Sequence, residues 1–107
     1  METGASTPEE LESLLEDALV MGDHEAVAQL FERNALLVTG NGAVELRGDG
    51  IGRHATALRD QGYRYVSDPQ LILQAHNTTL VVAQRAVNVM RRRGDGRWRY
   101  AISLLRA

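Results

Sequence analysis

The chain has 107 residues and a formal net charge of −2, with 12 basic and 14 acidic residues. This balance does not favour nucleic acid or an anionic membrane as a partner. The absence of cysteine excludes disulfides, thiolate metal sites and a cysteine nucleophile. The sequence lacks an apolar run of about 18 residues and a hydrophobic signal region. We therefore expect one cytoplasmic domain over residues 1–107, with residues 1–6 frayed.

The first helix has a well-defined predicted start. Thr7 can cap it, Pro8 suits its first position, and Glu10 completes a capping box. An apolar stripe at helical spacing follows, made of Leu11, Leu14, Leu15, Ala18 and Leu19. Gly22 is expected to end the helix.

A second helix, a short hairpin and a third helix are predicted next. Asp23 caps the second helix, in which Val27, Leu30 and Phe31 point inward. A strand is predicted over residues 35–39, and Asn41-Gly42 is a hairpin turn signal. Residues 44–47 are predicted to form the returning strand of this hairpin. The third helix spans residues 48–60 and places Ile51, His54, Ala55 and Leu58 on one face.

The remainder of the chain reads as strands over residues 63–73, 79–92 and 98–105. Pro69 indicates an edge or a bulge in the first of these strands. Helices that precede a meander of strands are typical of an α+β fold.

Strand alternation makes both faces of this sheet largely apolar, and three short helices can cover only one of them. We therefore predict a homodimer through the sheet, with Trp98, Tyr100 or Ile102 at or near the interface.

The order of these features over residues 8–106 resembles the nuclear transport factor 2-like superfamily, in its SnoaL-like and ketosteroid isomerase-like branch. The resemblance rests on Gly22-Asp23, Leu30-Phe31, the strand over residues 35–38, the Asn-Gly turn, Arg47-Gly48, Arg91-Arg92 and Gly96-Arg97-Trp98-Arg99. It implies a cone-like curved antiparallel sheet packed against three N-terminal helices around an apolar pocket. Family members usually have a further hairpin where residues 79–92 run together here. Either this strand is unusually long or one strand of the sheet is missing.

The resemblance argues against steroid isomerase chemistry. The base position of those isomerases falls on Thr39, the tyrosine donor on Leu15 and the protonated aspartate on Asn88. A threonine hydroxyl cannot act as the base near neutral pH, and leucine donates no hydrogen bond. Epoxide hydrolysis on this fold needs two aspartates in the pocket, and the two long C-terminal strands supply none.

His54 and Asn88 are the remaining catalytic candidates, one as acid or base and one as a group that polarises an oxygen. The alternative for His54 is a histidine at the rim of the core, and for Asn88 a structural amide. The predicted lining of the pocket is Leu15, Leu19, Phe31, Thr39, Ile51, Leu58, Val82, Gln84, Met90 and Ser103.

Two functions remain open, and neither needs a metal or a cofactor. The first is a dimeric, non-catalytic module that binds a small hydrophobic molecule. The second is a cofactor-free isomerase, cyclase or dehydratase acting on a polyketide-like or terpenoid-like substrate through His54 and Asn88. The missing carboxylates favour the first, because pocket chemistry normally needs a titratable group within reach.

Overall fold

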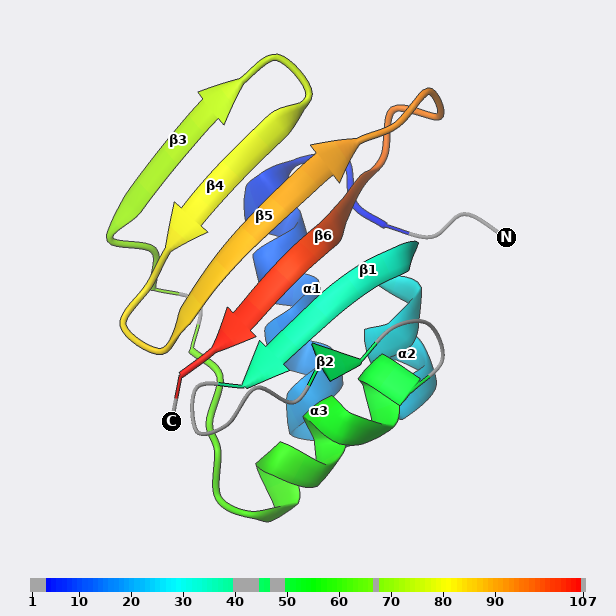
Figure 1. Ribbon diagram of the computed structural model, residues 1–107, viewed down its shortest axis with the longest axis vertical. Helices are drawn as coiled ribbons and strands as arrows, with labels where there is room; N and C mark the ends of the chain where they lie inside the picture. The colour runs from blue at the N-terminus through cyan, green and yellow to red at the C-terminus, as the bar shows by residue number, and fades with distance from the viewer. Residues whose placement is uncertain (1–3, 40–44, 47–49, 67, 107) are drawn as a thin grey trace.

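The computed structural model describes residues 4–39, 45–46, 50–66 and 68–106. Its elements are α1 (Pro8–Met21), α2 (His24–Gln29), β1 (Phe31–Thr39), β2 (Glu45–Leu46), α3 (Gly50–Asp60), β3 (Leu71–Ala75), β4 (Thr78–Val82), β5 (Ala86–Arg92) and β6 (Trp98–Leu105). The strands form one sheet in the order β2-β1-β6-β5-β4-β3, and the three helices lie on one of its faces (Figure 1). The predicted α+β class is confirmed. Strands β3 to β6 pair antiparallel, as expected, whereas β1 joins β6 in parallel.

The predicted helix boundaries are set by local capping. The Glu10 amide donates to the Thr7 hydroxyl at 3.0 Å, and Gly22 ends α1 in the left-handed conformation at φ 66°. Asp23 caps the start of α2, because its carboxylate accepts a hydrogen bond from the Ala26 amide at 3.1 Å. No helix within the described ranges is long and apolar enough to cross a membrane.

Residues 4–6 are held against the sheet instead of frayed. Ala5 is fully buried and exchanges two backbone hydrogen bonds with Trp98, at 3.0 and 2.8 Å. Residues 1–3 of the segment expected to fray lie outside the described residues.

Two other predicted boundaries change. Phe31 begins β1 instead of ending α2, and its ring lies 5.1 Å from that of Tyr100. The strand predicted over residues 63–73 is reduced to β3, because no described residue of 63–70 belongs to a strand. The Asn41-Gly42 turn and residues 48–49 of the third predicted helix lie outside the described residues.

The predicted long strand over residues 79–92 is two strands joined by a tight turn. The Ala83 amide donates to the Ala86 carbonyl at 2.8 Å, and β4 and β5 pair as a hairpin. The further hairpin of the resembling family is therefore present. Because of this turn, the inward- and outward-facing residues of β4 are the opposite of those predicted for a single strand. Val81, and not Val82, lies opposite Asn88. The prediction that Val82 and Gln84 line a pocket with Asn88 is wrong, because Val82 is on the opposite face and Gln84 is exposed in the turn.

A bulge between β5 and β6 changes which residues of the last strand face the helices. Met90 pairs with Tyr100 and Val89 with Ile102, which leaves Ala101 as the extra residue. Trp98 and Tyr100 are buried within the domain, whereas Ile102 is 42% exposed on the other face. Of the three residues suggested for a dimer interface, only Ile102 is exposed.

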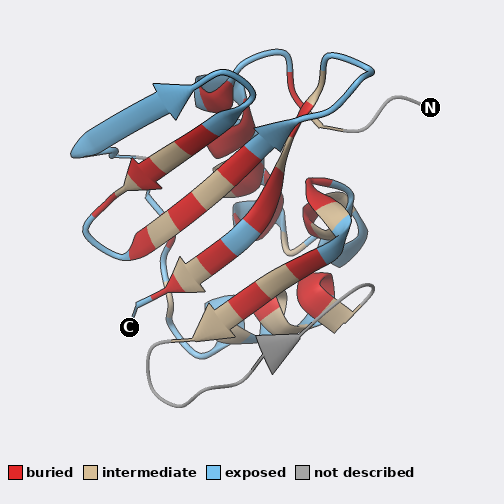
Figure 2. Ribbon diagram, turned by 45° about the horizontal axis from the view of Figure 1, so that its top comes forward, coloured by how far each residue is buried: buried red, intermediate tan, exposed pale blue. Residues whose placement is uncertain are grey.

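The face of the sheet turned away from the helices, here called the outer face, is apolar. Two rows cross it in register, one of Leu73, Leu80, Val89, Ile102 and Leu36, the other of Leu71, Val82, Val87, Leu104 and Val38. None of these ten side chains is buried, and Figure 2 shows them alternating with buried residues along β4, β5 and β6.

Candidate functional site

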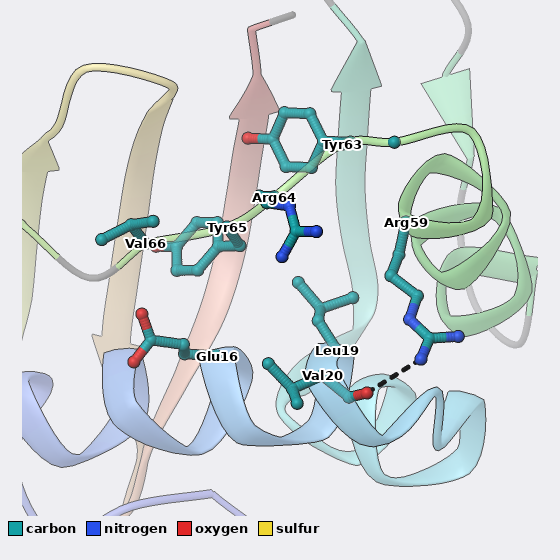
Figure 3. A pocket seen from close by; sticks show the side chains of 9 residues that line it. Glu16, Leu19, Val20, Arg59, Tyr63, Arg64, Tyr65 and Val66 are labelled. Atoms are coloured by element: carbon teal, nitrogen blue, oxygen red, sulfur yellow. Dashed lines mark hydrogen bonds between the residues drawn. The ribbon is translucent and has the colours of Figure 1, made fainter.

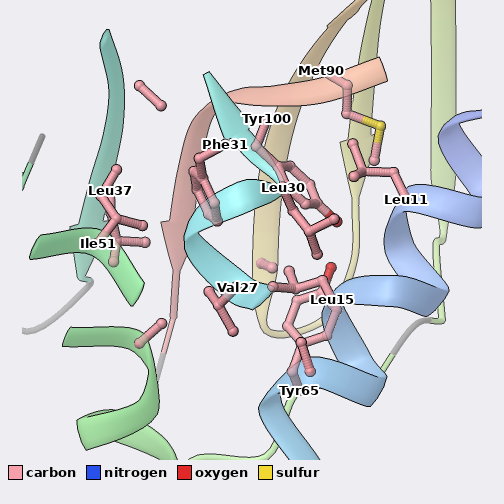
Figure 4. Packing of buried hydrophobic residues seen from close by; sticks show 14 of the residues in the cluster. Leu11, Leu15, Val27, Leu30, Phe31, Leu37, Ile51, Tyr65, Met90 and Tyr100 are labelled. Carbon is pink, nitrogen blue, oxygen red and sulfur yellow. The ribbon is translucent and has the colours of Figure 1, made fainter. Parts of the chain in front are cut away.

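The space between the helices and the sheet is filled by side chains. Leu15, Phe31, Ile51 and Met90, which were predicted to line a pocket, are at most 8% exposed and belong to one apolar cluster. Figure 4 shows these residues packed together with aromatic rings that include Tyr65 and Tyr100. These predicted lining residues are therefore part of the core.

A buried polar group lies inside this core, centred on a carboxylate of α1. Glu12 is only 2% exposed, and one of its oxygens, Oε2, accepts three hydrogen bonds. The donors are the Tyr65 hydroxyl at 2.6 Å, the Asn88 amide at 3.2 Å and the Tyr100 hydroxyl. Ser103 extends the group by donating to the Asn88 amide oxygen at 2.6 Å. We call these five residues the Glu12 cluster.

Burial dominates the electrostatics of the Glu12 cluster. Removal from water raises the pKa of Glu12, even though the hydrogen bonds from Tyr100, Tyr65 and Asn88 act to lower it. Burial, together with the adjacent carboxylate, also raises the pKa of Tyr65 and of Tyr100. Both hydroxyls therefore stay protonated and act as donors. Oxygen Oε1 of Glu12 is buried without a partner among the described residues.

Sequence reasoning overlooked Glu12 and Tyr65. Glu12 lies four residues after Pro8 and three before Leu15, so it shares the buried stripe of α1. An acidic residue in an apolar stripe was the available signal. Tyr65 lies in the part of the predicted strand over residues 63–73 that is not a strand in the structure, so strand alternation does not predict its inward direction.

The two predicted catalytic residues, Asn88 and His54, lie in different surroundings. The Asn88 amide is fully engaged, because its nitrogen donates to Glu12 and Tyr65 and its oxygen accepts from Ser103. His54 is half-buried on α3, and its Nε2 atom is enclosed without a partner in the described part of the chain. Thr39 ends β1, and Leu58 packs at the margin of the core.

An open cavity of about 470 Å³ lies beside the core, and we call it the lateral cavity. Its lining consists of Glu16, Leu19, Val20, Arg59, Gly62, Tyr63, Arg64, Tyr65 and Val66. These residues come from the second half of α1, the end of α3 and the segment that follows α3 (Figure 3). Leu19 is the one residue of the predicted lining set that lies here.

The walls of the lateral cavity combine apolar surface with a few polar groups. Val20 and Val66 are 64% and 55% exposed. The Arg59 guanidinium is held by Asp60 and by the Val20 carbonyl, each at 3.0 Å. Burial raises the pKa of Tyr63 to about 12, and its hydroxyl donates to the Arg85 carbonyl. Sites for small molecules commonly combine apolar walls with a few placed polar groups.

A smaller cavity of about 200 Å³ lies at the start of α1. Its lining is Pro8, Glu9, Glu12, Ser13, Pro69, Ile72 and Val81. Within the described ranges, no group of three His, Asp or Glu side chains is placed to hold a metal ion.

Solved structures with similar folds identify the architecture. One is provisionally assigned as a calcium/calmodulin-dependent protein kinase type II association domain from Thiobacillus denitrificans (TM-score 0.76, 15% identity, 98% of each chain covered). Another is a ketosteroid isomerase-like protein from Erwinia carotovora atroseptica (TM-score 0.70, 13% identity, 92% of this chain and 91% of that chain covered). A third is an NTF-2 like protein of unknown function from Shewanella oneidensis (TM-score 0.63, 13% identity, 92% and 94% covered).

No protein-family model and no curated protein matches the sequence. The structural likenesses show that the chain has the nuclear transport factor 2-like fold. The SnoaL-like branch stays a prediction. A fold shared at this level of identity leaves function to be argued from the site.

Proposed function

We propose that this chain, with its nuclear transport factor 2-like fold, is a homodimeric module that binds a small hydrophobic molecule in the lateral cavity. The observation that carries the proposal is the pair Val20 and Val66, whose side chains are largely exposed on the walls of a concave site. Together with the half-buried ring of Tyr63, they offer apolar surface that a ligand would remove from water. The volume of the cavity falls within the range of about 300–1,000 Å³ common for small-molecule sites.

Binding of the neutral fluorescent probe N-phenyl-1-naphthylamine tests this proposal, because its emission rises in an apolar environment. Val20→Asp places a carboxylate in the cavity wall and should weaken probe binding at least about tenfold, since the bound probe would desolvate that charge. Met21→Asp is the matched control, because Met21 is the next residue of α1, is 78% exposed and does not line the cavity. Equal binding by the wild type and Val20→Asp would contradict the proposal.

The outer face supports the homodimer part of the proposal. Its two rows of apolar side chains run across five strands without a charged residue. Arg91, near the end of β5, lies opposite Arg99, near the start of β6, so charged side chains lie beyond these rows. An apolar centre with a charged margin is the usual anatomy of a protein interface. A second copy of the chain would bury both outer faces at once.

Sedimentation at micromolar concentration tests the dimer. The wild type should sediment at about twice the chain mass of 11.8 kDa. Ile102→Arg should sediment as a monomer, because it places a charge near the middle of the outer face. Met21→Arg, on the exposed side of α1, should remain dimeric. A monomeric wild type would refute this part of the proposal.

The alternative of an enzyme that uses His54 and Asn88 has less support. The Asn88 amide already makes its hydrogen bonds inside the core, to Glu12, Tyr65 and Ser103. The three positions that correspond to the catalytic groups of the isomerases hold Thr39, Leu15 and Asn88, which supply no base. We therefore favour binding without steroid isomerase chemistry.

A further inference from the structure

The charges around the lateral cavity are unevenly placed. Figure 3 shows the Glu16 carboxylate near Tyr65 and Val66 at one end and Arg59 at the opposite end. The Arg64 guanidinium lies between these ends, turned into the cavity beside Tyr65 and above Leu19. A ligand in the cavity would therefore lie beside the positive charge of Arg64.

The two arginines of the cavity differ in how their charges are compensated. Arg59 forms an ion pair with Asp60 and donates to the Val20 carbonyl, so its charge is compensated and its guanidinium is held in place. No hydrogen bond or ion pair joins Arg64 to another residue of the described part of the chain. Among the described residues, Arg64 is therefore the arginine of the cavity whose charge and donors are open to an incoming anion.

An unpaired guanidinium beside apolar walls selects for one kind of ligand. Its planar donors match a carboxylate in a two-point hydrogen-bonded pair, and such pairs are stronger than neutral hydrogen bonds. The hydrocarbon part of the same molecule would lie along Leu19, Val20 and Val66.

From this arrangement we infer that the ligand is an amphipathic carboxylate, with its charge on Arg64 and its hydrocarbon portion on the apolar walls. The inference rests on the proposed binding function and adds the chemical class of the ligand. Arg64 is exposed, so solvent weakens its ion pair with the ligand carboxylate. We expect this ion pair to raise the affinity by about three- to tenfold.

Displacement of N-phenyl-1-naphthylamine by two molecules of equal chain length provides the test. At pH 8 decanoate is charged and 1-decanol is neutral, so the ratio of their affinities isolates the carboxylate. Wild type should bind decanoate about three- to tenfold more tightly than 1-decanol, and added salt should reduce this preference. Arg64→Gln should remove the preference while still binding 1-decanol. Arg53→Gln, an exposed arginine of α3 outside the cavity, should keep it.

Each other outcome decides against the inference. Equal or tighter binding of 1-decanol by wild type overturns the carboxylate and leaves the hydrophobic cavity in place. Loss of both compounds in Arg64→Gln shows that Arg64 maintains the shape of the cavity and does not select a charge. Failure of the probe to bind the wild type refutes the proposed function together with the inference.

Discussion

Replacing Glu12 by glutamine should change how stability depends on pH. Glutamine has nearly the same shape as the protonated glutamate and can accept at the oxygen that faces Tyr65, Tyr100 and Asn88. In both side chains the second polar atom would lack a partner, as Oε1 does now among the described residues. At pH 4 we therefore expect the two proteins to agree within about 1 kcal/mol in free energy of unfolding.

Above that pH the two proteins should separate. The pKa of Glu12 is raised by burial in the folded state, above its usual value of 4.5, so the folded protein holds this proton more tightly than the unfolded chain. Stability from this group is fully present below pH 4.5 and is lost as the pH rises through the folded pKa. Within that window the wild type should lose up to about 1.4 kcal/mol per pH unit relative to Glu12→Gln.

Urea unfolding, followed by the fluorescence of the single, buried Trp98, measures this difference from pH 4 to pH 8. Subtracting the two curves removes the titration of the other carboxylates. Glu9→Gln, at an exposed position on the same helix, is the control for the change of glutamate to glutamine itself. A flat or falling advantage for Glu12→Gln would refute the reasoning, because it would mean that the hydrogen bonds outweigh burial.

Two further predictions concern the buried packing. Tyr65→Phe removes a hydrogen-bond donor to Glu12 and an acceptor for the Asn88 amide, so it should reduce the free energy of unfolding by about 1–3 kcal/mol. Tyr63→Phe should cost less, because the Tyr63 hydroxyl donates to a backbone carbonyl near solvent. Equal losses in urea titrations would contradict the role of the Glu12 cluster. Gly52→Ala would place a Cβ atom 2.0 Å from the His24 carbonyl oxygen, so α2 and α3 would have to move apart. This should reduce the free energy of unfolding by about 2 kcal/mol or more and lower the melting temperature. Gly50→Ala in the same helix meets no atom of the described residues within 4 Å and should be neutral or slightly stabilising. The reverse order of the two variants would show that the close approach of α2 and α3 does not limit stability.

The sequence was most informative where structure depends on neighbours in the chain. The caps Thr7 and Asp23, the stop at Gly22 and the final strand all follow from local chemistry, and the structure confirms them. The α+β class followed from the order of such elements.

Errors arose where one residue changes the alternation of a strand. The turn after Ala83 and the bulge at Ala101 each reverse which side chains face the helices, and neither position carries a glycine or proline to announce it. The sequence therefore predicts Val82 in the interior and Trp98 and Tyr100 near a dimer interface, whereas Val82 lies on the outer face and both aromatic residues are buried. A pattern of apolar residues cannot show such a shift unless the pairing partner is known.

The location of the cavity could not have been predicted from periodicity. Periodicity predicts a pocket surrounded by the inward-facing residues, but Tyr65 and Tyr100 reach Glu12 and fill that volume. The open space instead lies beside the core, where Val20 and Val66 are exposed on segments far apart in the sequence. Only the tertiary arrangement brings these two side chains to one cavity.

The most direct test of the proposed site is to observe which methyl groups contact a bound neutral ligand. Intermolecular nuclear Overhauser effects between N-phenyl-1-naphthylamine and the assigned methyl groups of the wild-type protein would locate it. We predict contacts to Leu19, Val20 and Val66, the aliphatic residues of the lateral cavity. Contacts to Leu15 and Met90 in the core, or to Val89 and Ile102 on the outer face, without contacts to Val20 and Val66, would contradict the account.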